Sequence, residues 1–198
     1  MIYKGVIYRS RVGNPGSSVE TVKLKICLVG EARVGKSSLA RRFVYNEFDE
    51  RYLPTLGTNV SRKDIAVDTP KGPVQVVLTV WDIMGEPTFR DLLKDAYFAE
   101  VQGALAVADL TRPETVEALP DWISAVESVS GKVPVVILGN KSDLPAAPGA
   151  REALEALARS NVVEHHVTSA KSGDGVNKAF ATLAVVAVLS AKRGLDSL

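Results

Sequence analysis

The segment from Gly30 to Ser37 holds the residues whose types and spacing most clearly specify chemistry. It fits the pattern G-x-x-x-x-G-K-[S/T], directly after a predicted strand and at the start of a predicted helix. Its glycines let the backbone turn tightly, so that successive amides and the helix N-terminus converge on phosphate oxygens. Lys36 adds a positive charge, and the Ser37 hydroxyl is an oxygen ligand that Mg²⁺ accepts. The pattern predicts a site for a phosphate-bearing nucleotide.

A second motif, Asn140-Lys141-Ser142-Asp143, points to the base. It follows a predicted strand, at the edge of the sheet where doubly wound folds bind ligands. The Asp143 carboxylate can accept two hydrogen bonds from a purine that carries an N–H beside an amino group, which guanine has and adenine lacks. We therefore expect Asp143 to select guanine.

A third motif, Thr168-Ser169-Ala170-Lys171, follows the last predicted strand in the same topological position. A backbone amide there could meet the guanine carbonyl oxygen. Taken alone, either short motif is weak, and Lys141 or Lys171 could be a solvated loop lysine. The order and spacing of all three motifs favour one guanine-nucleotide pocket.

Composition limits the architecture and the partners. The chain has 198 residues, of which 46% are hydrophobic, and its formal net charge is +1. This length suits one domain, and this charge provides no overall field that would attract nucleic acid or anionic lipid. Cys27 is the only cysteine, which excludes an internal disulfide and favours a reducing compartment, so we expect a cytoplasmic protein.

Short β-branched runs alternate with turns and helical stretches, which is typical of a largely parallel α/β sheet with helices on both faces. Six strands are predicted, at residues 23–29, 58–67, 74–81, 104–109, 133–138 and 162–167. Helices are predicted at residues 36–46, 88–98, 114–129, 150–159 and 176–189. The second and third strands are separated by a connection too short for a helical crossover, so we expect one antiparallel strand.

With these motifs in this order, residues 22 to about 190 resemble the small Ras-like GTPases, in particular their Rab-type branch. The family's five loops correspond to Gly30 to Ser37, Thr55, Asp82 to Gly85, Asn140 to Asp143, and Ser169 to Lys171. The resemblance implies the P-loop NTPase fold of a small G domain. It also implies a molecular switch that hydrolyses GTP to GDP and phosphate with Mg²⁺.

The resemblance implies roles for individual residues. Phe48 would stack on the base, although its position also suits core packing. Ser37, Thr55 and Asp82 would hold Mg²⁺, with Asp82 acting through water. The residues expected to take part in hydrolysis are Lys36, Thr55, Gly85 and Glu86. The residues expected to bind nucleotide are Arg33, Val34, Gly35, Lys36, Ser37, Ser38, Phe48, Tyr52, Thr55, Gly85, Asn140, Lys141, Asp143, Leu144, Ser169, Ala170 and Lys171.

The sequence departs from the family at Glu86, where a glutamine usually orients the attacking water. A carboxylate has no amide donor, and it adds negative charge beside the phosphates, so we expect slow intrinsic hydrolysis. Arg33 stands where the family commonly has a small residue. It could supply positive charge during hydrolysis, or it could be a loop arginine that faces solvent.

The segments at residues 48–60 and 83–97 would be the two switch loops, which are held by the γ-phosphate and contacted by effectors and regulators. Val60 replaces an aromatic residue common in Rab-like proteins, which makes familiar Rab effectors doubtful. The stretch from Gly194 to Leu198 contains no cysteine, so we expect no direct lipid anchor. We also expect a monomer.

The predicted division is an N-terminal extension over residues 1–20, a G domain over 21–191 and a short tail over 192–198. Residues 2–8 of the extension could add an edge strand or form a disordered end. Two functions remain open. The chain is either a GTP-hydrolysing switch or a non-catalytic module locked to one nucleotide. A P-loop kinase would need an acceptor domain for which this length leaves no room.

Overall fold

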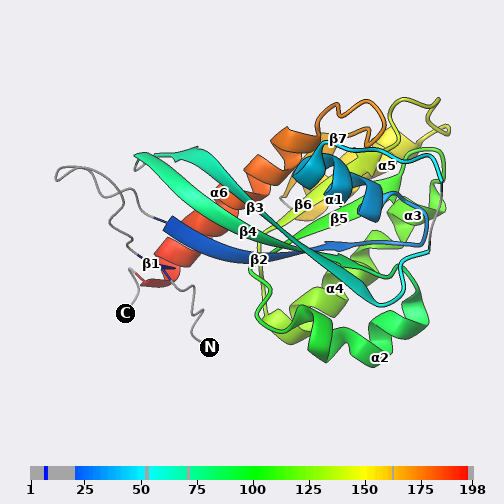
Figure 1. The fold of residues 1–198 in the computed structure, drawn as a ribbon. Helices are drawn as coiled ribbons and strands as arrows, with labels where there is room; N and C mark the ends of the chain where they lie inside the picture. The colour runs from blue at the N-terminus through cyan, green and yellow to red at the C-terminus, as the bar shows by residue number, and fades with distance from the viewer. Residues whose placement is uncertain (1–6, 9–20, 52–53, 71, 162, 196–198) are drawn as a thin grey trace.

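The computed structural model describes residues 7–8, 21–51, 54–70, 72–161 and 163–195 (Figure 1). Its centre is a mixed sheet in the order β3-β4-β2-β5-β6-β7, with β1 paired to β2 beside this path. The strands are β1 (Ile7–Tyr8), β2 (Thr21–Val29), β3 (Thr58–Thr69), β4 (Gly72–Ile83), β5 (Gly103–Asp109), β6 (Val135–Asn140) and β7 (Glu164–Val167). The predicted six-stranded sheet and its antiparallel β3–β4 pair are confirmed.

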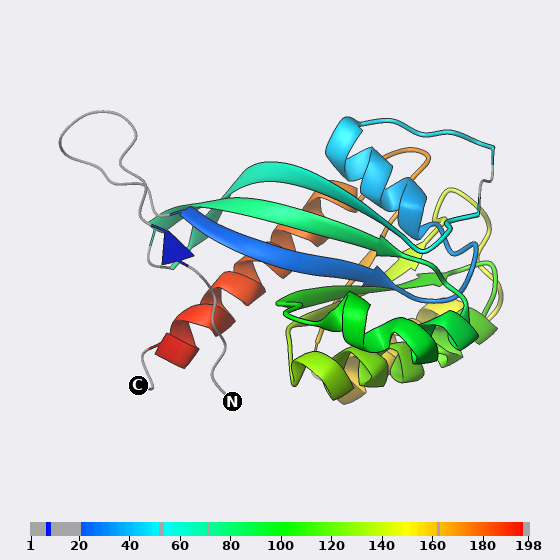
Figure 2. The ribbon, with the colours of Figure 1, turned by 60° about the horizontal axis from the view of Figure 1, so that its bottom comes forward.

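Helices cover both faces of the sheet, as predicted (Figures 1 and 2). They are α1 (Lys36–Tyr45), α2 (Pro87–Phe98), α3 (Glu114–Glu117), α4 (Leu119–Ser130), α5 (Ala150–Asn161) and α6 (Val176–Leu195). One hydrophobic cluster packs α1 and α6 against the sheet. A second cluster packs α2 to α5 against the other face.

The alternation of side chains along β2 explains the two layers. Leu24, Ile26 and Leu28 point into the cluster under α1 and α6, whereas Cys27 and Val29 point into the cluster on the other face. Successive strand residues face opposite sides of a sheet, so a strand buried on both sides is apolar at nearly every position. On the α1 and α6 side, the rings of Phe43 and Phe180 stack with centroids 3.8 Å apart.

The parallel strands all end at the same edge. β2 pairs in parallel with β4 and β5, and β5 and β6 continue the parallel order to β7. The loops after these strands carry the predicted motifs, so the topology brings together segments more than 130 residues apart in the sequence. This edge is where ligands bind in open α/β sheets.

Several element boundaries differ from the prediction. The helix predicted over residues 114–129 is divided into α3 and α4, because Pro120 near the start of α4 lacks the N–H that a continuous helix would use. β6 begins two residues later than predicted, after Pro134. α6 continues to Leu195, beyond the predicted end at residue 189.

The N-terminal extension contributes a short strand. Ile7 and Tyr8 pair antiparallel with Val22 and Thr21, which supports the edge-strand alternative and adds a seventh strand to the predicted six. The rest of the extension lies outside the described residues. The division into extension, domain and tail stays a prediction.

The helix predicted over residues 176–189 contains an apolar stretch, residues 179–189, which packs into the core. Phe180, Leu183 and Val188 are fully buried in α6. Within the described part of the chain, no helix combines the length and apolar character required to cross a membrane.

Cys27 should be chemically inert in the folded protein. Its side chain is fully buried, and burial raises the pKa of the thiol to about 12. The thiolate is the reactive form, so we expect no stoichiometric reaction with Ellman's reagent at pH 8 under native conditions. One thiol per chain should react in denaturant. Rapid reaction of the native protein would contradict the packing around β2.

Candidate functional site

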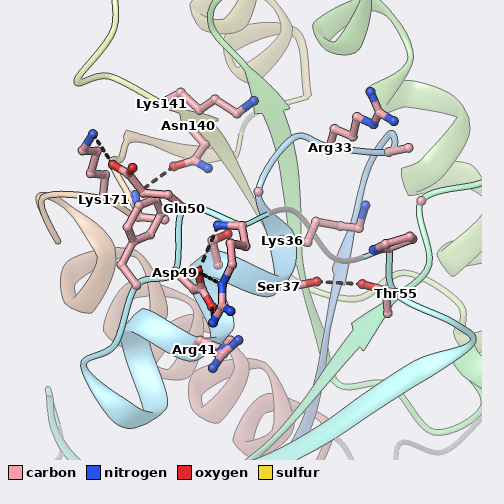
Figure 3. Close-up of a pocket in the computed structure, with 18 of the residues that line it drawn as sticks. Arg33, Lys36, Ser37, Arg41, Asp49, Glu50, Thr55, Asn140, Lys141 and Lys171 are labelled. Atoms are coloured by element: carbon pink, nitrogen blue, oxygen red, sulfur yellow. Dashed lines mark hydrogen bonds and ion pairs between the residues drawn. The ribbon is translucent and has the colours of Figure 1, made fainter.

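A cavity of about 580 Å³ lies at the carboxyl edge of the sheet. Figure 3 shows Lys36, Ser37 and Thr55 in one part of its wall, and Asn140, Lys141 and Lys171 in another. Asp143 lines the same cavity. The three sequence motifs therefore meet around a single space, which Lys36 and Asp143 both line.

The loop from Gly30 to Ser37 connects β2 to α1 with a tight turn. Gly35 precedes the helix with φ of 97°, a left-handed conformation that favours glycine. A Cβ atom at Gly35 would lie 2.4 Å from Nδ2 of Asn140. Both the backbone conformation and the close contact explain why glycine occupies this position.

Lys36 lies at the centre of this loop. Its side chain is buried, and its ammonium group donates to the carbonyl oxygens of Gly30 and Glu31 at 2.7 and 2.8 Å. Burial lowers the pKa of Lys36 to about 8, although the nearby Asp82 and Glu31 carboxylates favour the charged form. An anion in the cavity would favour the charged form further.

Gly85 brings the start of the second predicted switch against this loop. A Cβ atom at Gly85 would lie 2.4 Å from Nζ of Lys36 and 2.6 Å from the carbonyl oxygen of Glu31. Any larger residue would force the two segments apart. Because position 85 is a glycine, its backbone can lie close to the ammonium group of Lys36.

Three oxygen-bearing side chains gather beside Lys36. The hydroxyl oxygens of Ser37 and Thr55 are 2.8 Å apart, as the dashed line in Figure 3 shows. Asp82 is almost fully buried behind them, and its Oδ1 atom has no hydrogen-bond partner. Burial raises the pKa of Asp82, whereas Ser37 and Lys36 act in the opposite direction.

Asn140 joins the loops at the other end of the cavity. Its buried side-chain amide donates to the carbonyl oxygen of Val34 at 2.9 Å. Its Oδ1 atom accepts from the hydroxyl of Thr168 at 3.2 Å and from the backbone N–H of Ala170 at 3.3 Å. One side chain thus connects the Gly30 to Ser37 loop with the loop after β7.

Ser169 orients Asp143. The hydroxyl of Ser169 donates to Oδ1 of Asp143 at 2.6 Å, and the same hydroxyl oxygen accepts the backbone N–H of Ser172 at 3.1 Å. Ser169 is buried, whereas Asp143 lines the cavity. The buried Ser169 hydroxyl thus holds the Asp143 carboxylate in one orientation.

Sequence reasoning missed the residue that anchors Lys141. The ammonium group of Lys141 pairs with Asp109 Oδ2 at 2.6 Å, and Arg112 contacts the same oxygen at 3.2 Å. Burial of Asp109 raises its pKa, but hydrogen bonds from Lys141 and Thr111 outweigh this effect and lower it. Arg112 also donates to the carbonyl oxygen of Ala32 at 2.8 Å. The sequence did offer one clue to this contact, because Asp109 is an acidic residue at the end of β5, on the edge of the sheet where the motifs lie.

An ion pair crosses the rim of the cavity. The ammonium group of Lys171 lies 2.8 Å from Oε1 of Glu50, which belongs to the first predicted switch (Figure 3). The pair raises the pKa of Lys171 and lowers that of Glu50. Both side chains are largely exposed, so salt should weaken the contact.

The structure brings most of the predicted residues together. Those that line the cavity are Arg33, Gly35, Lys36, Ser37, Ser38, Phe48, Thr55, Gly85, Glu86, Asn140, Lys141, Asp143, Leu144, Ala170 and Lys171. Val34, Ser169 and Asp82 lie behind this wall, where Val34 packs in the core. Phe48 lines the cavity and also packs against the core, whereas its stacking on a base stays a prediction. Tyr52 lies outside the described residues.

The two unusual residues lie at the Lys36 end. Arg33 has φ of 65° and lines the cavity. Glu86 is exposed, precedes the first turn of α2, and its negative charge favours the charged form of Lys36. A carboxylate therefore acts electrostatically on the group expected to bind phosphate.

Replacing Asn140 should destabilise the fold at this edge. We expect Asn140→Ala to lower the free energy of unfolding by about 2–4 kcal/mol, because the Val34 carbonyl and the Ala170 amide lose a buried partner. Chemical denaturation of the purified protein measures this change. The exposed Asn177 on α6 supplies the matched control Asn177→Ala, which should leave the midpoint nearly unchanged. Equal midpoints for both variants would contradict the role of Asn140.

Comparison with known proteins identifies the family. The profile described as "Ras family" matches residues 25–188. The chain is 32% identical to Ras-related protein Rab-13 of Rattus norvegicus over 162 residues, which are 81% of this chain and 77% of that protein. It is 32% identical to Ras-related protein SEC4 of Saccharomyces cerevisiae over 85% of this chain and 76% of that protein. Ras-related protein Rab-7b of Mus musculus is also 32% identical, over 89% of this chain and 86% of that protein.

The matched stretch includes the three motifs and the cavity they surround. The sequence resemblance to Ras-like proteins, with Rab proteins as similar relatives, is therefore confirmed. This chain belongs to the Ras family and is a GTP-binding switch protein.

Proposed function

We propose that this protein hydrolyses GTP to GDP and phosphate in a Mg²⁺-dependent reaction whose intrinsic rate is low. One observation carries the proposal. A single cavity is lined by Lys36 at the phosphate motif and by Asp143 at the base motif. A guanosine phosphate is the ligand whose two ends match these two groups.

The oxygen cluster beside Lys36 fits Mg²⁺. Ligands at 2.0–2.1 Å on adjacent corners of an octahedron are about 2.9 Å apart, close to the 2.8 Å between the Ser37 and Thr55 hydroxyls. The unpaired buried oxygen of Asp82 fits a water-mediated contact to the same ion. A bound Mg²⁺ would supply positive charge to the phosphate oxygens.

We assign the phosphates to the loop and to Lys36, whose charge offsets the charge that develops during phosphoryl transfer. The Gly85 amide is assigned to the γ-phosphate because its backbone packs directly against Lys36. Arg33 lines this end of the cavity as a second cation. Thr55, which belongs to the first predicted switch, would be one of the residues that hold the ion.

The base belongs at the opposite end. Asp143, held by Ser169, would accept from the N–H and the amino group of guanine, and the Ala170 region would meet the carbonyl oxygen. Phe48, Leu144 and the aliphatic part of Lys171 provide apolar surface beside it. The Glu50–Lys171 pair would hold the first switch over the bound base.

Glu86 is the reason for a low rate. Hydrolysis needs a group that orients water toward the γ-phosphate, and a carboxylate repels that phosphate. The electrostatic effect of Glu86 on Lys36 supports its placement near the reacting end. The same feature favours the second candidate, a module that retains one nucleotide without turnover.

We also propose that effectors and regulators contact residues 48–60 and 83–97. Leu56 and Leu92, one in each segment, are strongly exposed at 85% and 73%, and exposed apolar side chains favour protein contacts. A monomer in the cytoplasm remains the expected state. The single, buried Cys27 is compatible with a reducing compartment.

Glu86→Gln should accelerate hydrolysis. We expect single-turnover GTP hydrolysis to rise at least about tenfold, because the amide removes a negative charge and adds a donor near the water. Quenched-flow or long-time phosphate release assays measure the rate. Glu86→Ala removes the charge without adding a donor and separates the two effects. An unchanged or lower rate in Glu86→Gln would contradict the role of Glu86, and absence of any phosphate release would favour the nucleotide-locked module.

Asp143→Ala should weaken guanine binding and remove base selectivity. Losing two hydrogen bonds to a charged acceptor is expected to weaken GTP at least about 100-fold. The wild-type protein should prefer GTP to inosine triphosphate, which lacks the amino group, and the variant should bind both equally. Isothermal titration with each nucleotide tests this. A preserved preference in Asp143→Ala would overturn the assignment of the base end.

A further inference from the structure

Trp122 connects α4 to the phosphate loop. Its side chain is fully buried, and its indole N–H donates to Oε1 of Glu31 at 3.0 Å. Glu31 is the second residue of the phosphate loop, 91 positions away in the sequence. None of the motifs found in the sequence includes Trp122. This hydrogen bond is partly buried, and a hydrogen bond to a carboxylate that is partly shielded from water is stronger than a fully exposed one.

Trp122 also contacts Arg90, which belongs to the second predicted switch. α2 lies beside α4 on the same face of the sheet (Figures 1 and 2). The guanidinium carbon of Arg90, on α2, lies 5.1 Å from the centroid of the Trp122 ring. This is within the range of a cation–π interaction. The side chain of Arg90 is only 15% exposed and also pairs with Asp91 at 2.8 Å, so its position is well defined.

Glu31 closes the connection from the other side. Its carbonyl oxygen accepts from Lys36, and the backbone of Gly85 packs against the same carbonyl group. Gly85 and Arg90 flank the start of α2. The second switch therefore contacts Glu31 directly through Gly85 and indirectly through Arg90 and Trp122.

We propose that Trp122 is a positioning residue that couples the second switch to the phosphate loop through Arg90 and Glu31. The inference rests on the proposed function, because it requires α2 to move when the γ-phosphate is lost. Movement of α2 would remove Arg90 from the ring of Trp122 and loosen Glu31, which contacts Lys36. Trp122 thus helps retain nucleotide and senses which nucleotide is bound.

The sequence offers a spectroscopic test, because Trp81 and Trp122 are the only tryptophans. In a Trp81→Phe background, all tryptophan emission comes from Trp122. We expect the emission spectrum to differ between protein loaded with GDP and protein loaded with a non-hydrolysable GTP analogue. Arg90→Ala should reduce that difference at least about twofold, and Arg90→Lys should retain more of it because it keeps a cation. The matched control Arg151→Ala, on the exposed face of α5, should change nothing.

Nucleotide release provides a second readout. Trp122→Phe and Glu31→Ala should each accelerate release of fluorescently labelled GDP about tenfold, because a charged hydrogen bond is lost. The double variant should release GDP no faster than the faster single variant, since both remove the same interaction. Glu31→Gln should restore slow release, because its amide oxygen still accepts the indole N–H. Circular dichroism checks that each variant is folded.

The outcomes separate this inference from the proposed function. If the wild-type protein binds no guanine nucleotide, the proposed function fails, and Arg90→Ala must still shift the Trp122 emission of the purified protein if the contact exists. If nucleotide binds but the emission of Trp122 is identical in both loaded forms, the inference alone is overturned. Additive effects of Trp122→Phe and Glu31→Ala, or fast release in Glu31→Gln, would also overturn it.

Discussion

The site depends on the buried amide of Asn140. Its three hydrogen bonds reach Val34 in the phosphate loop and Thr168 and Ala170 in the loop after β7. Loops held only by their own ends would leave the distance between the phosphate and base ends variable. The Asn140 amide can join the two loops because it donates a hydrogen bond to one and accepts hydrogen bonds from the other. Neither a carboxylate nor a hydrophobic residue of the same size can do both. Asn140 therefore helps to set the spacing of the cavity, together with the contacts that Arg112 and Lys141 make to Asp109.

Around this frame, charged groups gather at the Lys36 end of the cavity. Lys36 is surrounded by carbonyl oxygens and by the carboxylates of Asp82, Glu31 and Glu86. Lys36 and Asp82 are buried, which strengthens the interaction between them relative to water. Glu86 is itself exposed, so solvent screens its effect on Lys36. On the proposed function, nucleotide binding and hydrolysis would be separable, since the residues expected to hold phosphate are present while Glu86 replaces the residue expected to orient water.

Local sequence signals predicted the sheet, the edge at which the cavity lies, and 15 of the 24 residues that line the cavity. They succeeded because glycine spacing, strand ends and loop motifs act over a few residues. The Trp122–Glu31 and Asp109–Lys141 contacts were not predicted, because they join residues far apart in sequence and each partner is unremarkable in its own segment. The break between α3 and α4 did have a local signal in Pro120, which the single helix predicted over residues 114–129 did not take into account.

The last helix has a practical consequence for handling the protein. α6 starts just after the loop that contains Lys171 and runs for 20 residues to Leu195, a length of about 30 Å at 1.5 Å per residue. Its far end and β1 lie away from the cavity, at the opposite end of the sheet (Figure 1). A sensor chip or dye attached beyond Leu195 would leave the cavity mouth open to solvent. Immobilisation at that end should therefore preserve access for nucleotides and partner proteins.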